Sequence, residues 1–212
     1  MKHFAVDDLC LLRYLRARNF DVGKASLMLQ NTLSWRKSFG LDQMYTGWRE
    51  TIERENATGK MYTRGFDKEG HALLYLKPSL ENTHDFDGNM KHLVFNLEQC
   101  IRRMNEDGRG KEKVVLLVDY ENWGLTNCPP LKTSKETMYI LQNHYPERLY
   151  RAVAINPPWI FSIFWNAIAP FIDPVTKAKI VMLTYPPEIC KEKLLGNDTC
   201  FDCISLTCLR DD

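Results

Sequence analysis

Few residues in this chain combine the types and spacing that catalysis requires. The sequence has no G-x-S-x-G, H-E-x-x-H or G-x-x-x-x-G-K-[ST] motif, which are signatures of serine hydrolases, zinc proteases and P-loop proteins. Asp119 ends the apolar run VVLLVD, where α/β enzymes often keep a catalytic carboxylate. A strand-end aspartate more often bonds to nearby backbone, however. These features favour a protein that is not an enzyme.

The cysteines and histidines do not make a clear metal site. Cys200 and Cys203 form a C-x-x-C pair with Cys208 close by, but a fourth zinc ligand is not evident. The five histidines share no helical face with cysteines or carboxylates at ligand spacing. We therefore expect no metal, and no cofactor apart from a bound ligand. Seven cysteines are an odd count, with three scattered through the chain and four near its end, and we favour a reducing cytosolic compartment.

Overall charge and hydropathy exclude several further classes. The 212 residues carry a formal net charge of +1, so the chain has no strong basic field for nucleic acid. Charges break every apolar run near the N-terminus, which is unlike a signal peptide. No run reaches the roughly 18 apolar residues of a transmembrane helix. We expect a cytoplasmic globular protein that binds anions only through local placement of charge.

Residues 158–173, PWIFSIFWNAIAPFID, do not fit an ordinary amphipathic pattern. Only two side chains between the ends of the segment are polar, so a helix here would be apolar on all sides. The segment is too short to span a bilayer, and Pro170 interrupts it. It is either a central core helix or the movable wall of a lipid pocket. Lys177 and Lys179 follow it and favour the second interpretation, because cations beside an apolar surface suit anionic headgroups.

The elements that must position these residues begin with helices. Asp7 and Asp21 are suitable N-caps for two helices, and Gly40 is a suitable stop for the second. A looser helical segment follows from about residue 41 to residue 55. We therefore predict an all-helical N-terminal unit.

Beyond this unit, strands and helices alternate. Residues 60–64 and 72–77 are predicted to pair as a hairpin around a D-K-E-G turn, and helices are predicted at 87–107 and 131–144. Three further runs are apolar throughout, as in strands covered on both faces of a parallel sheet: 114–118, 152–155 and 180–183. This order predicts an α/β fold with a mostly parallel sheet flanked by helices.

Several blocks of this sequence resemble a known family. Residues 11–40, which include LLRYLRARNFD, are similar to the helical N-terminal part of the CRAL-TRIO, or Sec14-like, lipid-binding proteins. Residues 143–180 resemble the centre of that family's lipid-binding domain. Residues 60–78 resemble its first hairpin, and residues 114–124 its central strand. The YPERL and PWIFSIFW…PFID blocks together are specific to the family.

The resemblance implies a twisted sheet that forms the floor of an apolar lipid pocket, with helices over its other sides. It implies binding of a phospholipid, most commonly phosphatidylinositol, with transfer between membranes or presentation there, and no bond made or broken. Such a protein is expected to be a cytoplasmic monomer, peripheral on membranes, that binds no nucleic acid. The alternative is a degenerate lipid fold that recruits protein partners at membranes without exchanging lipid.

Headgroup positions of the family are matched by charged and hydroxyl side chains. Lys179 offers a cation to a phosphate, and Thr176 offers a hydroxyl three residues earlier on the same side of a helical turn. Glu147 can accept from ring hydroxyls or pair with Lys179, while Arg18 and Arg148 fall at further headgroup positions. The competing interpretation is that these charges are solvated or form structural ion pairs. Six residues represent the gate, which is expected to swing at a membrane: Trp159, Phe161, Phe164, Trp165, Ile168 and Phe171.

We divide the chain into three parts on these grounds. Residues 1–55 form the helical N-terminal unit, and residues 56–195 form the lipid-binding domain, which we expect to be incomplete at its C-terminal end. Residues 196–212 form a cysteine-rich tail of unknown role. These boundaries favour a shortened isoform.

Overall fold

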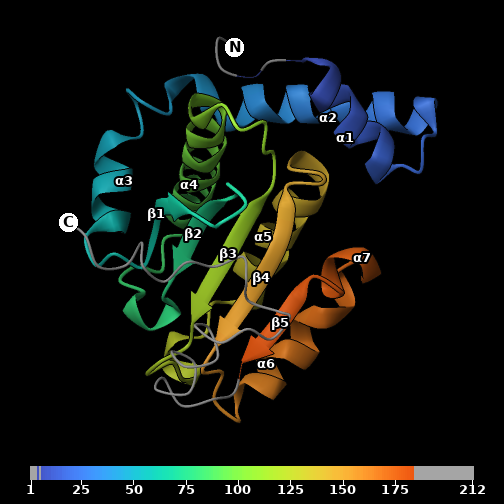
Figure 1. Ribbon diagram of the computed structural model, residues 1–212. Helices are drawn as coiled ribbons and strands as arrows, with labels where there is room; N and C mark the ends of the chain where they lie inside the picture. The colour runs from blue at the N-terminus through green and yellow to red at the C-terminus, as the bar shows by residue number, and fades with distance from the viewer. Residues whose placement is uncertain (1–3, 5, 184–212) are drawn as a thin grey trace.

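The computed structural model describes residue 4 and residues 6–183 (Figure 1). Residues 184–212 lie outside the described residues. The predictions for the cysteine-rich tail 196–212, including the possible zinc ligands Cys200, Cys203 and Cys208, therefore stay predictions.

The first two helices begin and end where the sequence predicts, whereas the looser segment predicted from about residue 41 to residue 55 divides into a 3₁₀ turn and a short helix. Asp7 accepts a hydrogen bond from the Cys10 amide at 2.7 Å, and Asp21 accepts one from the Lys24 amide at 3.0 Å. Gly40 ends the second helix with φ 79°, a left-handed conformation that glycine adopts without steric cost. The bounds are α1 Asp8–Ala17, α2 Val22–Phe39, the 3₁₀ turn η1 Leu41–Gln43 and α3 Arg49–Asn56.

Five strands follow in one sheet with the order β1-β2-β3-β4-β5. The first two pair antiparallel as the predicted hairpin, and every other neighbouring pair is parallel. The register aligns Leu74, Leu116, Ala152 and Ile180 in one row across the sheet. The bounds are β1 Met61–Phe66, β2 Ala72–Leu76, β3 Val114–Asp119, β4 Leu149–Ile155 and β5 Ile180–Leu183.

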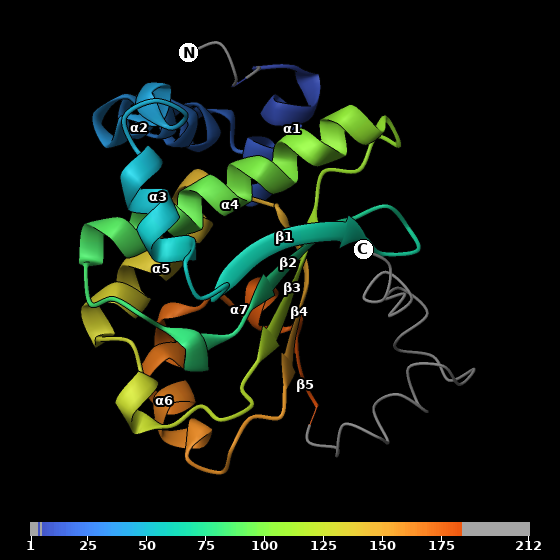
Figure 2. The same cartoon turned by 90° about the vertical axis from the view of Figure 1, so that its left-hand side faces the viewer.

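The helices that connect the parallel strands cover one face of the sheet, as Figure 2 shows. Each connection from β2 onward moves one strand further in the same direction, and right-handed crossovers in a constant direction place their helices on the same side. The bounds are η2 Pro78–Leu80, α4 Phe86–Asp107, η3 Leu125–Asn127, α5 Leu131–His144, α6 Phe161–Ile168, η4 Ala169–Phe171, α7 Pro174–Lys177. The predicted α/β class is confirmed.

The apolar strands bury alternate side chains on opposite faces, as the continuous apolar runs predict. Val114 and Leu116 of β3 pack with Leu97 of α4 on the helix-covered face. Val115 and Leu117 belong to a separate buried cluster on the other face. Successive strand residues point to opposite sides, so a strand buried on both faces must be apolar at every position.

A buried ion pair fixes the N-terminal unit to the α/β part. Arg36 of α2 donates two hydrogen bonds to Glu98 of α4, at 2.7 and 3.1 Å. Tyr145, just after α5, donates to the same carboxylate at 2.6 Å. Trp35 stacks on the ring of His144 with 4.1 Å between ring centroids. The α1–α2 turn, which carries Arg18, is therefore held in a defined position relative to α4 and the C-terminal end of α5.

A second buried pair joins α3 to the sheet. The Glu55 carboxylate accepts a hydrogen bond from Lys60 at 2.5 Å and one from Thr83 at 2.8 Å. Burial acts to raise the pKa of Glu55, but these hydrogen bonds outweigh it and hold that pKa below its usual value. Gly88 of α4 lies against this carboxylate, so a side chain there would meet it.

Candidate functional site

The five predicted headgroup residues line one cleft of about 390 Å³. The turn between α1 and α2 supplies Arg18, the turn between α5 and β4 supplies Glu147 and Arg148, and the α7 segment supplies Thr176 and Lys179. Three segments far apart in the sequence therefore line one opening. Their shared position fits a common ligand better than five unrelated surface residues would.

The cleft has an apolar base below its charged rim. Leu97 of α4, Val114 and Leu116 of β3, and Met138 and Leu141 of α5 line it together with the charged residues. It therefore lies on the helix-covered face of the sheet. A ligand with a polar head and an apolar body would match this division of surfaces.

Cations outnumber carboxylates in the cleft. Arg16, Arg18, Arg148 and Lys179 line it together with only Glu147 and Asp173. The net charge of the whole chain is +1, so the excess here is local. Arg16 was not among the predicted headgroup residues. The RAR spacing in the last turn of α1 could have indicated it, because residues two apart at a frayed helix end can both reach one neighbouring site.

Arg148 is a largely desolvated cation without a close ion pair, although the charges of Glu112 and Glu98 favour its protonated form. Its Nη1 donates to the carbonyl oxygen of Glu112 at 2.8 Å, and no carboxylate of a described residue pairs with it within 4.0 Å. Burial, with repulsion from Arg13, lowers the pKa of Arg148 to about 10. The guanidinium is still protonated at neutral pH. A desolvated guanidinium of this kind favours an anionic ligand with oxygen acceptors.

Glu147 stands between two lysines in a left-handed backbone conformation. Its Oε2 lies 3.6 Å from Lys113 Nζ and 3.8 Å from Lys179 Nζ, so the expected pairing with Lys179 is present. Its φ is 56°, a region that costs a non-glycine residue about 1–2 kcal/mol. Strain of this kind is tolerated when the surroundings hold the residue in place, and it clusters at functional sites.

The α7 segment presents Thr176 and Lys179 on one side, as predicted. Asp173 caps the segment by accepting from the Thr176 amide at 2.8 Å, and the Lys179 amide donates to the Thr176 carbonyl at 3.0 Å. Burial acts to raise the pKa of Asp173, but hydrogen bonding to Thr176 prevails and lowers it. Asp173 therefore stays ionised and keeps this turn in shape.

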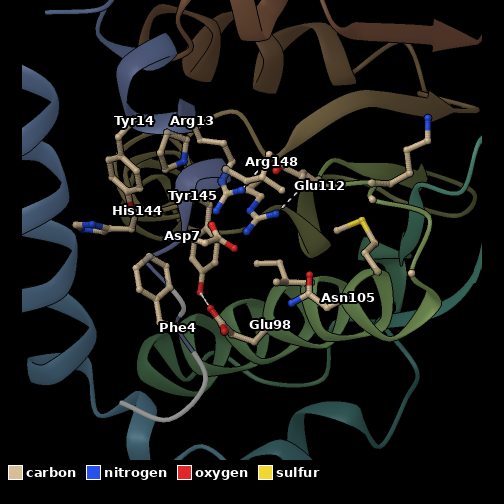
Figure 3. Close-up of a pocket in the computed structure, with 17 residues that line it drawn as sticks. Phe4, Asp7, Arg13, Tyr14, Glu98, Asn105, Glu112, His144, Tyr145 and Arg148 are labelled. Atoms are coloured by element: carbon tan, nitrogen blue, oxygen red, sulfur yellow. Dashed lines mark hydrogen bonds and ion pairs between the residues drawn. The ribbon is translucent and has the colours of Figure 1, made fainter. Parts of the chain in front are cut away.

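A second cavity, of about 280 Å³, shares Tyr145, Pro146 and Arg148 with the cleft (Figure 3). In it Arg13 of α1 forms an ion pair with Glu112 at 2.9 Å. Arginine and lysine side chains line this cavity in the same number as carboxylates, so its charges are balanced. The cleft with the five matched residues is therefore the better anion site.

The six predicted gate residues do not all face the same way. Phe161 and Ile168 of α6 are buried, and Phe164 and Trp165 are partly buried. Trp159 and Phe171, which flank α6, are exposed, as is Ile163 on its outer face. The helix thus packs one side inward and exposes Ser162, Ile163 and Asn166 on the other, and the gate role of the segment stays a prediction.

The inner side of α6 closes against aromatic residues that follow β3. The ring centroid of Phe161 lies 4.6 Å from that of Tyr120 and 6.0 Å from that of Trp123. Phe164 lies 5.7 Å from Trp123. The Trp123 indole nitrogen is buried without a hydrogen-bond partner among the described residues. Such an unsatisfied donor makes this contact less stable than a fully apolar one.

The alternative catalytic residue behaves as a strand-end aspartate. Asp119 accepts from the Glu121 amide at 2.9 Å and lies 3.3 Å from Lys77 Nζ. Within residues 4 and 6–183, no three histidine, cysteine or carboxylate side chains are grouped as a metal site. None of the helices in that part of the chain is long and apolar enough to cross a membrane.

The fold and cleft define an α/β domain with a helical N-terminal unit and one charged opening between them. Comparison with known families agrees: the CRAL/TRIO domain matches residues 56–192, and the CRAL/TRIO N-terminal domain matches residues 2–31. This chain belongs to the CRAL/TRIO family, and the resemblance seen in the sequence is confirmed.

Individual relatives agree with this assignment. A CRAL-TRIO domain-containing protein of Schizosaccharomyces pombe is 42% identical over 171 residues, which cover 81% of this chain and 16% of that protein. Phosphatidylinositol transfer protein PDR17 of Saccharomyces cerevisiae is 34% identical over 181 residues, 81% of this chain and 51% of its own length. The chain therefore spans at most about half of these two relatives. The crystal structure of Sfh5 matches with a TM-score of 0.67 at 17% identity, over 86% of this chain and 66% of Sfh5, which supports the fold.

Proposed function

We propose that this chain binds a phospholipid, with phosphatidylinositol as the preferred headgroup, and transfers or presents it at membranes without catalysing a reaction. The observation that carries the proposal is the cleft in which Arg148, a cation with no carboxylate partner among the described residues, meets four other residues matched to headgroup positions. The name of the relative PDR17, a phosphatidylinositol transfer protein, supports the same headgroup.

The chemistry of the headgroup fits the chemistry of the rim. A phosphodiester carries one negative charge, which the guanidinium groups of Arg148 and Arg18 and the ammonium of Lys179 can bind. Inositol adds several hydroxyls, for which Glu147 is an acceptor and Thr176 both a donor and an acceptor. A choline headgroup would place a further cation among these cations, so the rim favours an uncharged polyol.

The acyl chains need apolar surface beyond the base of the cleft. We propose that they enter when α6 moves away from Tyr120 and Trp123, on which it now closes. Moving α6 into water would expose Phe161 and Ile168, at about 1.5–3 kcal/mol for each side chain. At a bilayer the same side chains would meet lipid, so the cost of opening falls there and exchange is confined to membranes.

We further propose that the protein acts as a monomer that associates with the cytoplasmic face of membranes. The exposed Trp159 and Ile163 beside and on α6 support this proposal, because apolar side chains next to a lipid entrance suit transient insertion. Both statements are open to direct measurement by size-exclusion chromatography and by vesicle flotation.

The test compares two lysine variants in a phosphatidylinositol transfer assay between donor and acceptor vesicles. Lys179→Ala removes a charge from the cleft, whereas Lys68→Ala removes an exposed lysine from the β1–β2 turn. A charged hydrogen bond contributes about 1.5–3 kcal/mol, so we expect Lys179→Ala to lower transfer about 10- to 100-fold. Lys68→Ala should match the unaltered protein.

Native mass spectrometry of the purified chain gives the complementary result. Co-purifying phosphatidylinositol, reduced in Lys179→Ala, would support the proposal. A protein that carries no phospholipid and transfers none would contradict it and favour the alternative of an interaction module. Equal transfer by both lysine variants would remove the cleft from the headgroup assignment.

A further inference from the structure

A smaller cleft at the N-terminal unit adjoins the cleft lined by the five predicted headgroup residues, which we call the headgroup cleft. It measures about 190 Å³ and is lined by Lys24 and Leu27 of α2 and by Tyr139 of α5. Arg18 and Asn143 line both clefts, so the two openings are neighbours. The surface therefore runs from α2, past the headgroup cleft, to α7.

Exposed apolar side chains lie among, or next in sequence to, the residues that line these two clefts. We call them the rim patch: Phe20 in the α1–α2 turn, Leu27 on α2, Tyr139 on α5 and Val175 on α7. Each is between 53% and 62% exposed. One such residue on a surface is ordinary, but several beside two neighbouring clefts mark a contact surface.

The backbone holds Phe20 outward at a cost. Asn19 and Phe20 both adopt the left-handed conformation, with φ of 51° and 62°. Asparagine tolerates this region, but a bulky residue such as phenylalanine is strained there. Packing does not explain the choice of residue, because the ring is largely exposed. A strained, exposed aromatic side chain beside a binding cleft is a candidate for an external contact.

The charge around the rim patch indicates what it contacts. Arg16, Arg18, Lys24, Arg148 and Lys179 line the two clefts, with two carboxylates among the other lining residues. Lys24 is paired with Asp21 at 3.1 Å, while Arg16 and Arg18 have no ion-pair partner within 4.0 Å among the described residues. Cations interleaved with exposed aromatic and aliphatic side chains are typical of surfaces that bind anionic bilayers.

We propose that the rim patch docks on an anionic phospholipid bilayer, so that the headgroup cleft opens onto the membrane. The N-terminal helical unit is then a part of the membrane-binding surface, separate from the gate residues on and around α6. This inference rests on the proposed function, because the headgroup that the cleft would hold comes from a phospholipid of the bilayer.

The test measures flotation with vesicles of 70% phosphatidylcholine and 30% phosphatidylserine, and with vesicles of phosphatidylcholine alone. Phe20→Asn removes the ring and suits the left-handed backbone, and Leu27→Glu places a carboxylate in the patch. Leu9→Glu is the matched control, since Leu9 is a half-exposed leucine of α1 that lines the other cavity. Each patch variant should weaken binding to anionic vesicles about tenfold, and Leu9→Glu should bind as the unaltered chain does.

Lipid content, measured by native mass spectrometry on the same samples, separates this inference from the proposed function. Phe20→Asn should bind vesicles poorly and keep its phosphatidylinositol. The docking proposal is overturned if both patch variants float with anionic vesicles as well as Leu9→Glu does. It is also overturned if the unaltered chain carries lipid but does not bind anionic vesicles. A patch that instead holds two copies together, shown by a dimer that Leu27→Glu dissociates, also overturns it. Vesicle binding through the patch by a chain that carries no lipid would support docking and contradict lipid transfer.

Discussion

Replacing Arg36 with methionine tests how the N-terminal unit is held in place. The substitution keeps much of the side-chain volume but removes the charge that pairs with Glu98. The two side chains are 11% and 8% exposed, so the Glu98 carboxylate would stay buried without its cation. Removing one partner of a buried pair costs about 3–5 kcal/mol. Tyr145 still donates to Glu98, so we expect a loss near 3 kcal/mol.

Urea unfolding followed by tryptophan fluorescence and circular dichroism measures this loss. The control is Arg49→Met, which breaks a pair with Glu53 of similar length, 2.8 Å, whose side chains are 78% and 63% exposed. Exposed pairs of this kind contribute little to stability, because water and salt screen the two charges. If both variants unfold at the same urea concentration, the Arg36–Glu98 pair is not desolvated and the reasoning is wrong. Adding Glu98→Gln to Arg36→Met should recover part of the loss.

Two further predictions concern pH and helix glycines. Burial, with repulsion from Arg36, lowers the pKa of His144 from 6.5 to about 4, so its contribution to stability is complete above pH 6.5 and is lost as the pH falls toward 4. His144→Gln should reduce the pH dependence of the unfolding free energy over that range by about 3 kcal/mol; an unchanged dependence would show that His144 does not carry it. Gly88→Ala should lower the free energy of unfolding by about 1–3 kcal/mol, because the new Cβ would lie 2.5 Å from Glu55 Oε1. Gly23→Ala on α2 should raise it by up to about 1 kcal/mol, because the nearest atom to its Cβ would be 3.5 Å away. Thermal denaturation measures the stability of both glycine variants. If both substitutions change the stability in the same direction, the packing argument is wrong.

Local patterns in the sequence were sufficient to predict most of the fold. Asp7, Asp21 and Gly40 mark helix ends because their side chains, or the lack of one, satisfy the backbone at those positions. The run at residues 114–118 predicted a strand covered on both faces, because each face of a buried strand needs alternate apolar residues. Signals of this kind act over a few residues, so they are visible without tertiary information.

Features that depend on contacts between distant segments could not be predicted in the same way. Ser162 and Asn166, four residues apart, marked the exposed side of α6. No local pattern showed that its buried side packs through Phe161 on residues that follow β3. Arg16 joins the cleft only because the α1–α2 turn meets α7. The left-handed backbone conformation of Glu147 could not be predicted from its residue type, because glutamate usually avoids that conformation. Family resemblance supplied the five headgroup positions, and the structure shows that they share one opening.

The headgroup cleft is assembled from residues 16–19, 145–149 and 173–179, which has a consequence for biosynthesis. The first of these segments leaves the ribosome long before the last, and at 5–20 residues per second about 8–30 seconds separate them. A nascent chain that lacks residues 173–179 has no Thr176 or Lys179 to offer. Any lipid held by all three segments of this cleft must therefore be loaded after residue 179 has been synthesised.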